Sequence, residues 1–124
     1  MKITQILRLD LEGDGEDELL ISGTNYFSHA GIPSSPSAGS YSFVLLRRVV
    51  AGKVRPQWVA GEFYTKTKTF NAPAQYAIAA VLDLDGDGTM EVIVHGDYCE
   101  GGWITAFRCT PAKVEEMLEV GCGA

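Results

Sequence analysis

Residues 81–96 read VLDLDGDGTMEVIVHG and place alternating carboxylates between two short apolar runs. The apolar runs have the β-branched composition of strands, whereas the glycines between them are typical of a tight curl. Residues 8–23, which read RLDLEGDGEDELLISG, repeat this arrangement. Each segment therefore predicts two strands joined by an acidic loop.

The two acidic segments belong to an internal repeat that spans most of the chain. A shift of 73 residues aligns 8–23 with 81–96 and leaves eight of the sixteen positions identical. Further along, a shift of 60 residues aligns Arg48 with Arg108, because one loop of the first copy is longer. Each copy is expected to form one supersecondary unit. The two expected units are residues 1–62 and 63–124.

Short β-rich runs separated by turn residues predict a four-stranded antiparallel meander in each copy. The run Val114–Val120 also fits helical spacing. Its partner run in the first copy contains Pro56, which excludes a helix interior. We expect a turn at Glu100–Gly102. We expect strands at 3–9, 18–23, 41–50 and 53–60, and at 76–82, 90–96, 102–109 and 112–120. The predicted fold class is all-β, with two tandem four-stranded, blade-like sheets of the β-propeller type.

The acidic loop of the second copy has the composition of a calcium site. Its carboxylates recur at every second residue, so they converge only if the chain curls around a point, and they would then repel one another. Calcium resolves this conflict, because it takes about six to eight oxygen ligands in a tolerant geometry. Magnesium fits less well, since it demands octahedral geometry, and zinc prefers Cys and His ligands. The expected ligands are the side chains of Asp83, Asp85, Asp87 and Glu91 and the backbone carbonyl of Thr89.

The loop begins like an EF-hand, but the rest of that motif is missing. Position 12 of an EF-hand carries a bidentate Glu, whereas the corresponding residues here are Val94 and, in the first copy, Ile21. The residues that follow are typical of strands and not of the helix that an EF-hand requires. The EF-hand interpretation is therefore excluded, and the ninth position, Glu91, must close the site.

A strand–DxDGDGxxE–strand loop resembles the calcium-binding repeats of the FG-GAP family, also called VCBS-like repeats, which occur in the propeller of integrin α-subunits and in many bacterial proteins. The resemblance covers both copies and is most specific at 83–91. It implies calcium binding by the residues named above and by their counterparts in the first copy. Those counterparts are Asp10, Glu12, Asp14, Glu16 through its backbone carbonyl, and Glu18.

The chain departs from the family pattern in two places. Glu12 replaces the usual short carboxylate at the third loop position, so the first site is expected to bind calcium more weakly or differently. The Phe-Gly and Gly-Ala-Pro signatures that name the family are absent, and residues 70–73 (FNAP) are only a remote echo of them. The broad repeat class is therefore better supported than the integrin branch.

Composition limits the partners and the compartment. The formal net charge of −6 argues against nucleic acid and anionic membranes. No segment approaches the ~20 apolar residues of a membrane span, and the N-terminus lacks an apolar signal core. We therefore expect a cytoplasmic protein if the chain is complete, and an exported one is compatible with a fragment. Cys99, Cys109 and Cys122 allow at most one internal disulfide, and we interpret them as ordinary thiols.

The longest irregular segment, residues 24–40, is interpreted first as a flexible loop, although Tyr26, Phe27 and His29 could contact a ligand. Two blades cannot close a propeller. The chain could therefore be part of a longer propeller, assemble with copies of itself, or pack its two sheets as a sandwich. The leading hypothesis is a non-enzymatic calcium-binding module that acts through a protein partner or self-association. The alternatives are a propeller-type hydrolase or lyase with a loop-built active site, and a small oligomeric protein.

Overall fold

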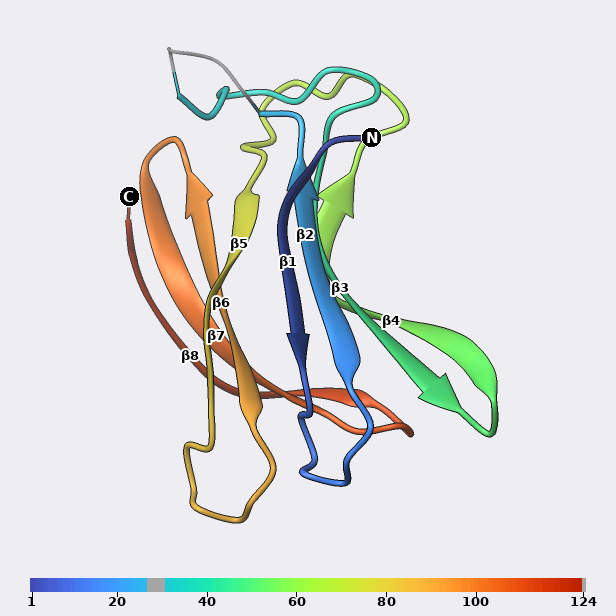
Figure 1. The fold of residues 1–124 in the computed structure, drawn as a ribbon. Coiled ribbons are helices and arrows are strands. Elements are labelled where there is room, and N and C mark those ends of the chain that lie inside the picture. Colours follow the sequence, from blue (N-terminus) through green and yellow to red (C-terminus); the bar gives the residue numbers. More distant parts are fainter. Residues whose placement is uncertain (27–30, 124) are drawn as a thin grey trace.

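The computed structural model describes residues 1–26 and 31–123, which form two four-stranded antiparallel sheets (Figure 1). The first sheet has the order β1-β2-β3-β4 and the second has the order β5-β6-β7-β8. The strands of the first sheet are β1 (Ile3–Leu9), β2 (Glu18–Thr24), β3 (Tyr41–Val50) and β4 (Lys53–Phe63). Those of the second are β5 (Gln75–Leu82), β6 (Glu91–Tyr98), β7 (Gly101–Cys109) and β8 (Val114–Gly123).

The prediction of two tandem four-stranded antiparallel sheets is confirmed. All eight strands lie where the sequence predicted them to within three residues at either end. The segment 114–123 is a strand, so its helical spacing has no structural counterpart. The predicted turn at Glu100–Gly102 is displaced. Residues 99–100 make the turn, and both glycines pair in β7, where Gly102 lies opposite Asp97 and Cys122.

The internal repeat extends to the register of the strands. Leu9 lies opposite Glu18 where β1 meets β2, and Leu82 lies opposite Glu91 where β5 meets β6. Each first strand also carries one irregularity in its register, as does each pairing of the third and fourth strands. Such bulges increase the local twist, and they lie at different positions of the repeat in the two sheets.

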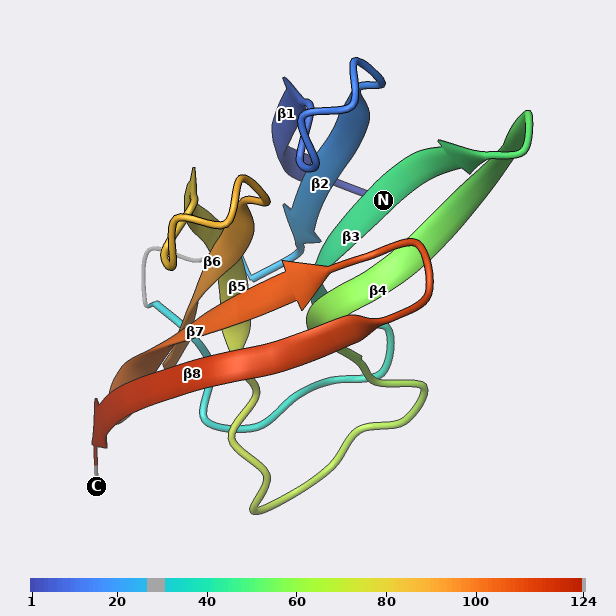
Figure 2. The same cartoon turned by 90° about the horizontal axis from the view of Figure 1, so that it is seen from below.

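One apolar core lies between the two sheets. Alternation in the strands turns one face of β2 and β3 toward β5, β6 and β7, and the side chains of both faces interlock there. Figure 2, seen from the end that carries the acidic loops, shows the β7–β8 hairpin reaching across to β4. The buried members of this core are Leu11, Leu20, Val44, Leu46, Val59, Ile78, Val92, Val94 and Cys109.

Polar contacts fix how the sheets sit against each other. The Gln5 amide both accepts from the N–H of Ile78 (2.8 Å) and donates to its carbonyl (3.0 Å). At the acidic-loop end, the N–H of Met90 donates to the carbonyl of Leu11 at 2.9 Å. Backbone groups between the sheets thus find hydrogen-bond partners where they are partly buried, as polar groups removed from water require. The two sheets are held as a pair with a defined registration.

No helix among the described residues is long and apolar enough to cross a bilayer.

Candidate metal centre

The acidic loop of the second sheet curls as its glycines predicted. Gly86 and Gly88 have φ angles of 75° and 89°, in the left-handed region that glycine adopts without steric cost. The carboxylate of Asp83 organises the curl by accepting the N–H groups of Gly86 (2.8 Å), Asp87 (3.1 Å) and Gly88 (2.9 Å). The loop therefore folds around the side chain of its first residue, in the manner of an Asx turn.

Three carboxylates of this loop converge. One oxygen from each of Asp83, Asp85 and Glu91 lies within 4.8 Å of the others. Glu91 is 1% exposed, and its Oε2 accepts the N–H of Leu84 at 2.8 Å. That hydrogen bond fixes the carboxylate and turns its Oε1 toward the other acidic groups. The loop thus presents an all-oxygen donor set of the kind that hard cations prefer.

A guanidinium lies among these carboxylates. Nη2 of Arg108, on β7, is 2.5 Å from Oδ2 of Asp85, 3.2 Å from Oδ2 of Asp87 and 3.0 Å from Oε1 of Glu91. The hydrogen bond from Arg108 is the main reason that the pKa of Asp85 lies below its usual value. The hydrogen bonds to Glu91 and Asp85 in turn raise the pKa of Arg108. A positive group therefore already contacts two of the three converging carboxylates, Asp85 and Glu91, together with Asp87.

The loop of the first sheet has the same backbone and a different arrangement of charges. Asp10 accepts the N–H groups of Asp14 (3.1 Å) and Gly15 (2.7 Å), and the Gly15 bond lowers the pKa of this carboxyl. Glu18 is buried, and its Oε2 accepts the N–H of Leu11 at 2.9 Å. Burial raises the pKa of Glu18. Among the described residues, this loop brings no three ligand atoms as close together as the second loop does.

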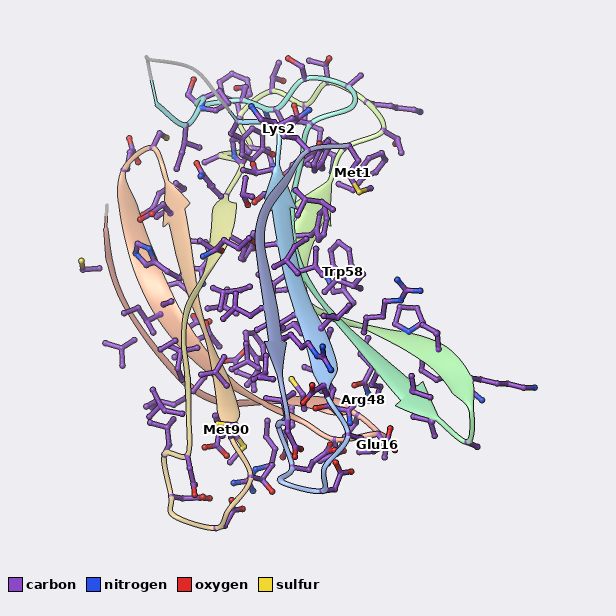
Figure 3. All side chains as sticks on the ribbon, viewed as in Figure 1. Met1, Lys2, Glu16, Arg48, Trp58 and Met90 are labelled. Carbon is purple, nitrogen blue, oxygen red and sulfur yellow. The ribbon has the colours of Figure 1, made fainter. Side chains whose placement is uncertain are left out.

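Arg48 explains the difference between the loops. Its side chain is 2% exposed, and Nη1 lies 2.6 Å from Oε1 of Glu12 and 3.9 Å from Oε1 of Glu18. Nη2 donates to the carbonyl of Cys109 at 3.0 Å and Nε donates to Gln57 at 2.9 Å. Figure 3 shows Arg48 and Glu16 at the end of the molecule that carries the acidic loops. The long side chain of Glu12 thus turns to an arginine that also holds the two sheets together.

The two residues predicted to offer backbone carbonyls occupy equivalent places. The N–H of Thr89 donates to Oδ1 of Asp87, and the N–H of Glu16 donates to Oδ1 of Asp14, both at 2.8 Å. These bonds repeat the turn geometry of the loop exit in both sheets. Ligation of calcium through their carbonyls stays a prediction.

Sequence reasoning did not assign the two arginines to the site. Arg108 lies opposite Glu91 in the β6–β7 ladder, and Arg48 comes from β3 in the same way. The sequence around the loops does not predict that the arginines pair with the acidic residues, because this pairing depends on the register of the third strand of each sheet. The alignment of Arg48 with Arg108 in the internal repeat was the one sign that could have found them.

Among the described residues, no second group of three or more Asp, Glu, His or Cys side chains lies close enough together to hold a metal ion. Tyr26 is 8% exposed and packed into the structure, while Phe27 and His29 lie outside the described residues. Nε2 of His95 lies 3.3 Å from Oδ1 of Asp97 at the surface of β6. All three cysteines are free thiols, and only Cys109 is buried.

No family model, curated protein or solved structure matches this chain. The likeness to FG-GAP repeats therefore depends on the residues of the two loops and on their repetition. What the chain can do has to be argued from the geometry of those loops.

Proposed function

We propose that this chain is a calcium-binding β-repeat module with a structural or interaction role. The observation that carries the proposal is that one oxygen from each of Asp83, Asp85 and Glu91 lies within 4.8 Å of the others. Asp87 belongs to the same cluster, because it contacts the Arg108 guanidinium that Asp85 and Glu91 also contact. All four ligands are oxygens, they come from one short loop, and one of them is anchored by burial. This donor set fits calcium better than zinc or magnesium.

The metal would act as a staple between two strands. Asp83 follows the last residue of β5, and Glu91 is the first residue of β6. An ion bound by both would hold the ends of these strands together and remove the repulsion between the carboxylates. A ligand that binds only the folded chain stabilises it by about 2.7 kcal/mol when its concentration is a hundredfold above Kd.

Calcium would have to compete with Arg108 for the carboxylates of the loop. It contributes one positive charge against the four carboxylates of the loop, so the loop keeps a net negative charge. A divalent ion would neutralise more of that charge while taking the oxygens that Arg108 now contacts on Asp85 and Glu91. Calcium and the guanidinium therefore compete for the same place.

The first loop is proposed as a weaker site of the same kind. Its candidate ligands repeat the order of the second loop, and its glycines adopt similar φ angles, 69° at Gly13 and 89° at Gly15. Glu12, however, forms an ion pair with the buried guanidinium of Arg48. Calcium would have to break that pair, because Arg48 is held in place by Gln57 and Cys109 as well.

The test is the thermal unfolding of the full chain with millimolar calcium, with magnesium and with chelator. We expect calcium to raise the melting temperature by several degrees and magnesium to raise it less. The rise should be lost in the Asp85→Ala/Asp87→Ala variant and kept in a Glu100→Ala/Glu115→Ala variant, which loses the same charge outside the loops. Equal melting temperatures of the wild type in calcium and in chelator would contradict calcium binding.

A further inference from the structure

The outward face of the second sheet repeats the inward face of the first. Outside the segments between the bulges, residues related by the internal repeat occupy the same positions in the ladders of the two sheets, so their side chains point to corresponding faces. In the first sheet this face packs in the core, and in the second it is turned away from the first sheet. The related pairs are Leu7/Ala80, Leu9/Leu82, Leu11/Leu84, Leu20/Ile93, Val44/Ile104, Leu46/Ala106 and Ala60/Val120.

This outward face is apolar and incompletely covered. Val44 and Leu11 are fully buried in the first sheet, whereas their counterparts Ile104 and Leu84 are 49% and 50% exposed. Val120 is 65% exposed on the same face. Together the seven second-sheet residues and Leu118 line a groove of about 370 Å³. A contiguous apolar face of this kind marks a contact surface.

The outward face of the first sheet is the complementary surface. Its residues Leu19, Ile21 and Phe43 correspond to Val92, Val94 and Trp103, which face the first sheet from the second. Ile6 and Trp58 are 62% and 52% exposed on this side. A groove of about 470 Å³ lies here. Its apolar lining consists of Met1, Tyr41, Phe43, Leu45, Trp58 and Phe63.

We infer that the outward face of β5–β8 packs against the outward face of β1–β4 of a second copy of this chain. The chain carries both halves of the contact, and the contact between its own two sheets shows that surfaces of these two kinds pack together. Such an interface is head-to-tail, so it produces a ring if the rotation closes and a filament if it does not.

The hydrogen bonds between the two sheets of one chain predict which hydrogen bonds would form between two copies. Arg48 donates to the carbonyl of Cys109 across the sheets, so the corresponding donor is Arg108 and the acceptor is the Val49 carbonyl of the second copy. The carbonyl of Leu11 accepts the N–H of Met90. Its counterpart, the Leu84 carbonyl, would then accept the N–H of Asp17 from the second copy.

Two variants, each with one face blocked, test this packing. Ile104→Lys/Val120→Lys blocks the second-sheet face, and Ile6→Lys/Trp58→Lys blocks the first-sheet face. Phe70→Lys changes an exposed aromatic residue outside both faces and serves as the control. Circular dichroism confirms folding, and the single variants Ile104→Lys and Ile6→Lys replace any double variant that does not fold. Native mass spectrometry and light scattering then give the masses over a range of concentrations, with chelator present so that the result does not depend on calcium.

The expected result is a wild type and a control that form oligomers with rising concentration, while each blocked variant alone keeps the 13.4 kDa mass of one chain. Mixing the two variants should give a dimer and nothing larger, because only one intact pair of faces remains. A monomeric wild type at every concentration would overturn the inference. A blocked variant that dimerises by itself would also overturn it, since that contact would pair like faces.

Discussion

The guanidinium of Arg108 lies 3.0 Å from the buried carboxylate of Glu91, so the acidic loop of the second sheet contains a cation supplied by the chain itself. In the first sheet, Arg48 approaches Glu18 to 3.9 Å and stays buried. The repeat therefore joins each acidic loop to the third strand of its sheet through an arginine. The two arginines differ in exposure, at 2% for Arg48 and 25% for Arg108. We therefore expect Arg48 to affect mainly the stability of the fold and Arg108 to affect calcium binding as well.

Replacing Arg108 with Gln should weaken the fold in chelator and strengthen calcium binding. Without the guanidinium, the carboxylates of Asp85, Asp87 and Glu91 repel one another, and the ion pairs that Arg108 makes with them are lost. The same carboxylates are then free for a metal. Chemical unfolding in chelator and calorimetric titration of calcium measure the two effects.

Arg55→Gln is the matched control, since Arg55 is exposed on β4 and makes the same change in net charge. It should leave both quantities near those of the wild type. If Arg108→Gln bound calcium no more tightly than wild type, competition between the arginine and the metal would be wrong, even where calcium binding itself is measurable.

Arg48 is expected to be essential to stability, unlike its neighbour Arg47. Arg48→Met leaves the buried Glu18 and the half-buried Glu12 without their cation and removes the hydrogen bond to the Cys109 carbonyl. Loss of one partner of a buried pair costs about 3–5 kcal/mol. The free energy of unfolding from urea denaturation should fall by this order.

Arg47→Met is the internal control, because Arg47 is exposed on the opposite face of β3. It should change the free energy of unfolding by less than about 0.5 kcal/mol, as surface substitutions usually do. Equal losses for the two variants would mean that the buried contacts of Arg48 do not hold the sheets together.

The strands and the acidic loop residues could be predicted because the patterns that indicate them lie within short segments and occur in both copies of the repeat. Alternating apolar residues and Asp-Gly turns recur at the same spacing, and the second copy supports each interpretation of the first. The predicted position of the β6–β7 turn is wrong because glycine is typical of turns but is also required in strands where a side chain would not fit. Gly101 instead lies so close to Cys122 and Gly123 on β8 that a Cβ atom would meet the Cys122 carbonyl oxygen at 2.4 Å. Its lack of a side chain serves strand packing and not a turn.

The arginines and the contact between the sheets could not be predicted in the same way. Arg108 reaches Glu91 through the register of β7 on β6, and Arg48 reaches Cys109 through the packing of two sheets. Neither relationship leaves a pattern in nearby residues. The prediction for the first loop is affected most, because its spacing predicts Glu12 as a calcium ligand, whereas the structure pairs Glu12 with Arg48.

Gly61 is expected to tolerate no side chain. Its φ of 149° is one that other residues rarely adopt, and a Cβ atom would lie 2.6 Å from the carbonyl oxygen of Ser42 and 2.7 Å from the ring of Trp58. Gly61→Ala should therefore lower the free energy of unfolding by several times the cost of Gly52→Ala. Gly52 also has a positive φ, 75°, but nothing lies within 4 Å of its Cβ position.

Urea denaturation of the two glycine variants measures this difference. Gly52→Ala should lose about 1 kcal/mol, the usual cost of left-handed backbone for alanine. Similar losses for both variants would mean that β4 can shift to accommodate the methyl group at position 61.

The buried thiol of Cys109 should make the fold sensitive to alkaline pH. Burial in the core raises the pKa of this thiol from 9.0 to about 11. Because the folded pKa is above the unfolded one, the associated stability is complete below pH 9 and is lost as the pH rises toward 11. The free energy of unfolding should fall by up to about 2–3 kcal/mol across this window.

Cys109→Ala should flatten this part of the pH profile even though the smaller side chain lowers stability at pH 7. Cys99→Ala, at an exposed thiol, is the control variant. A thiol reagent at pH 8 provides an independent measurement: the two exposed cysteines of the native chain should react quickly, and Cys109 only on unfolding. Rapid reaction of all three thiols in the native protein would show that the core between the sheets opens at the position of Cys109.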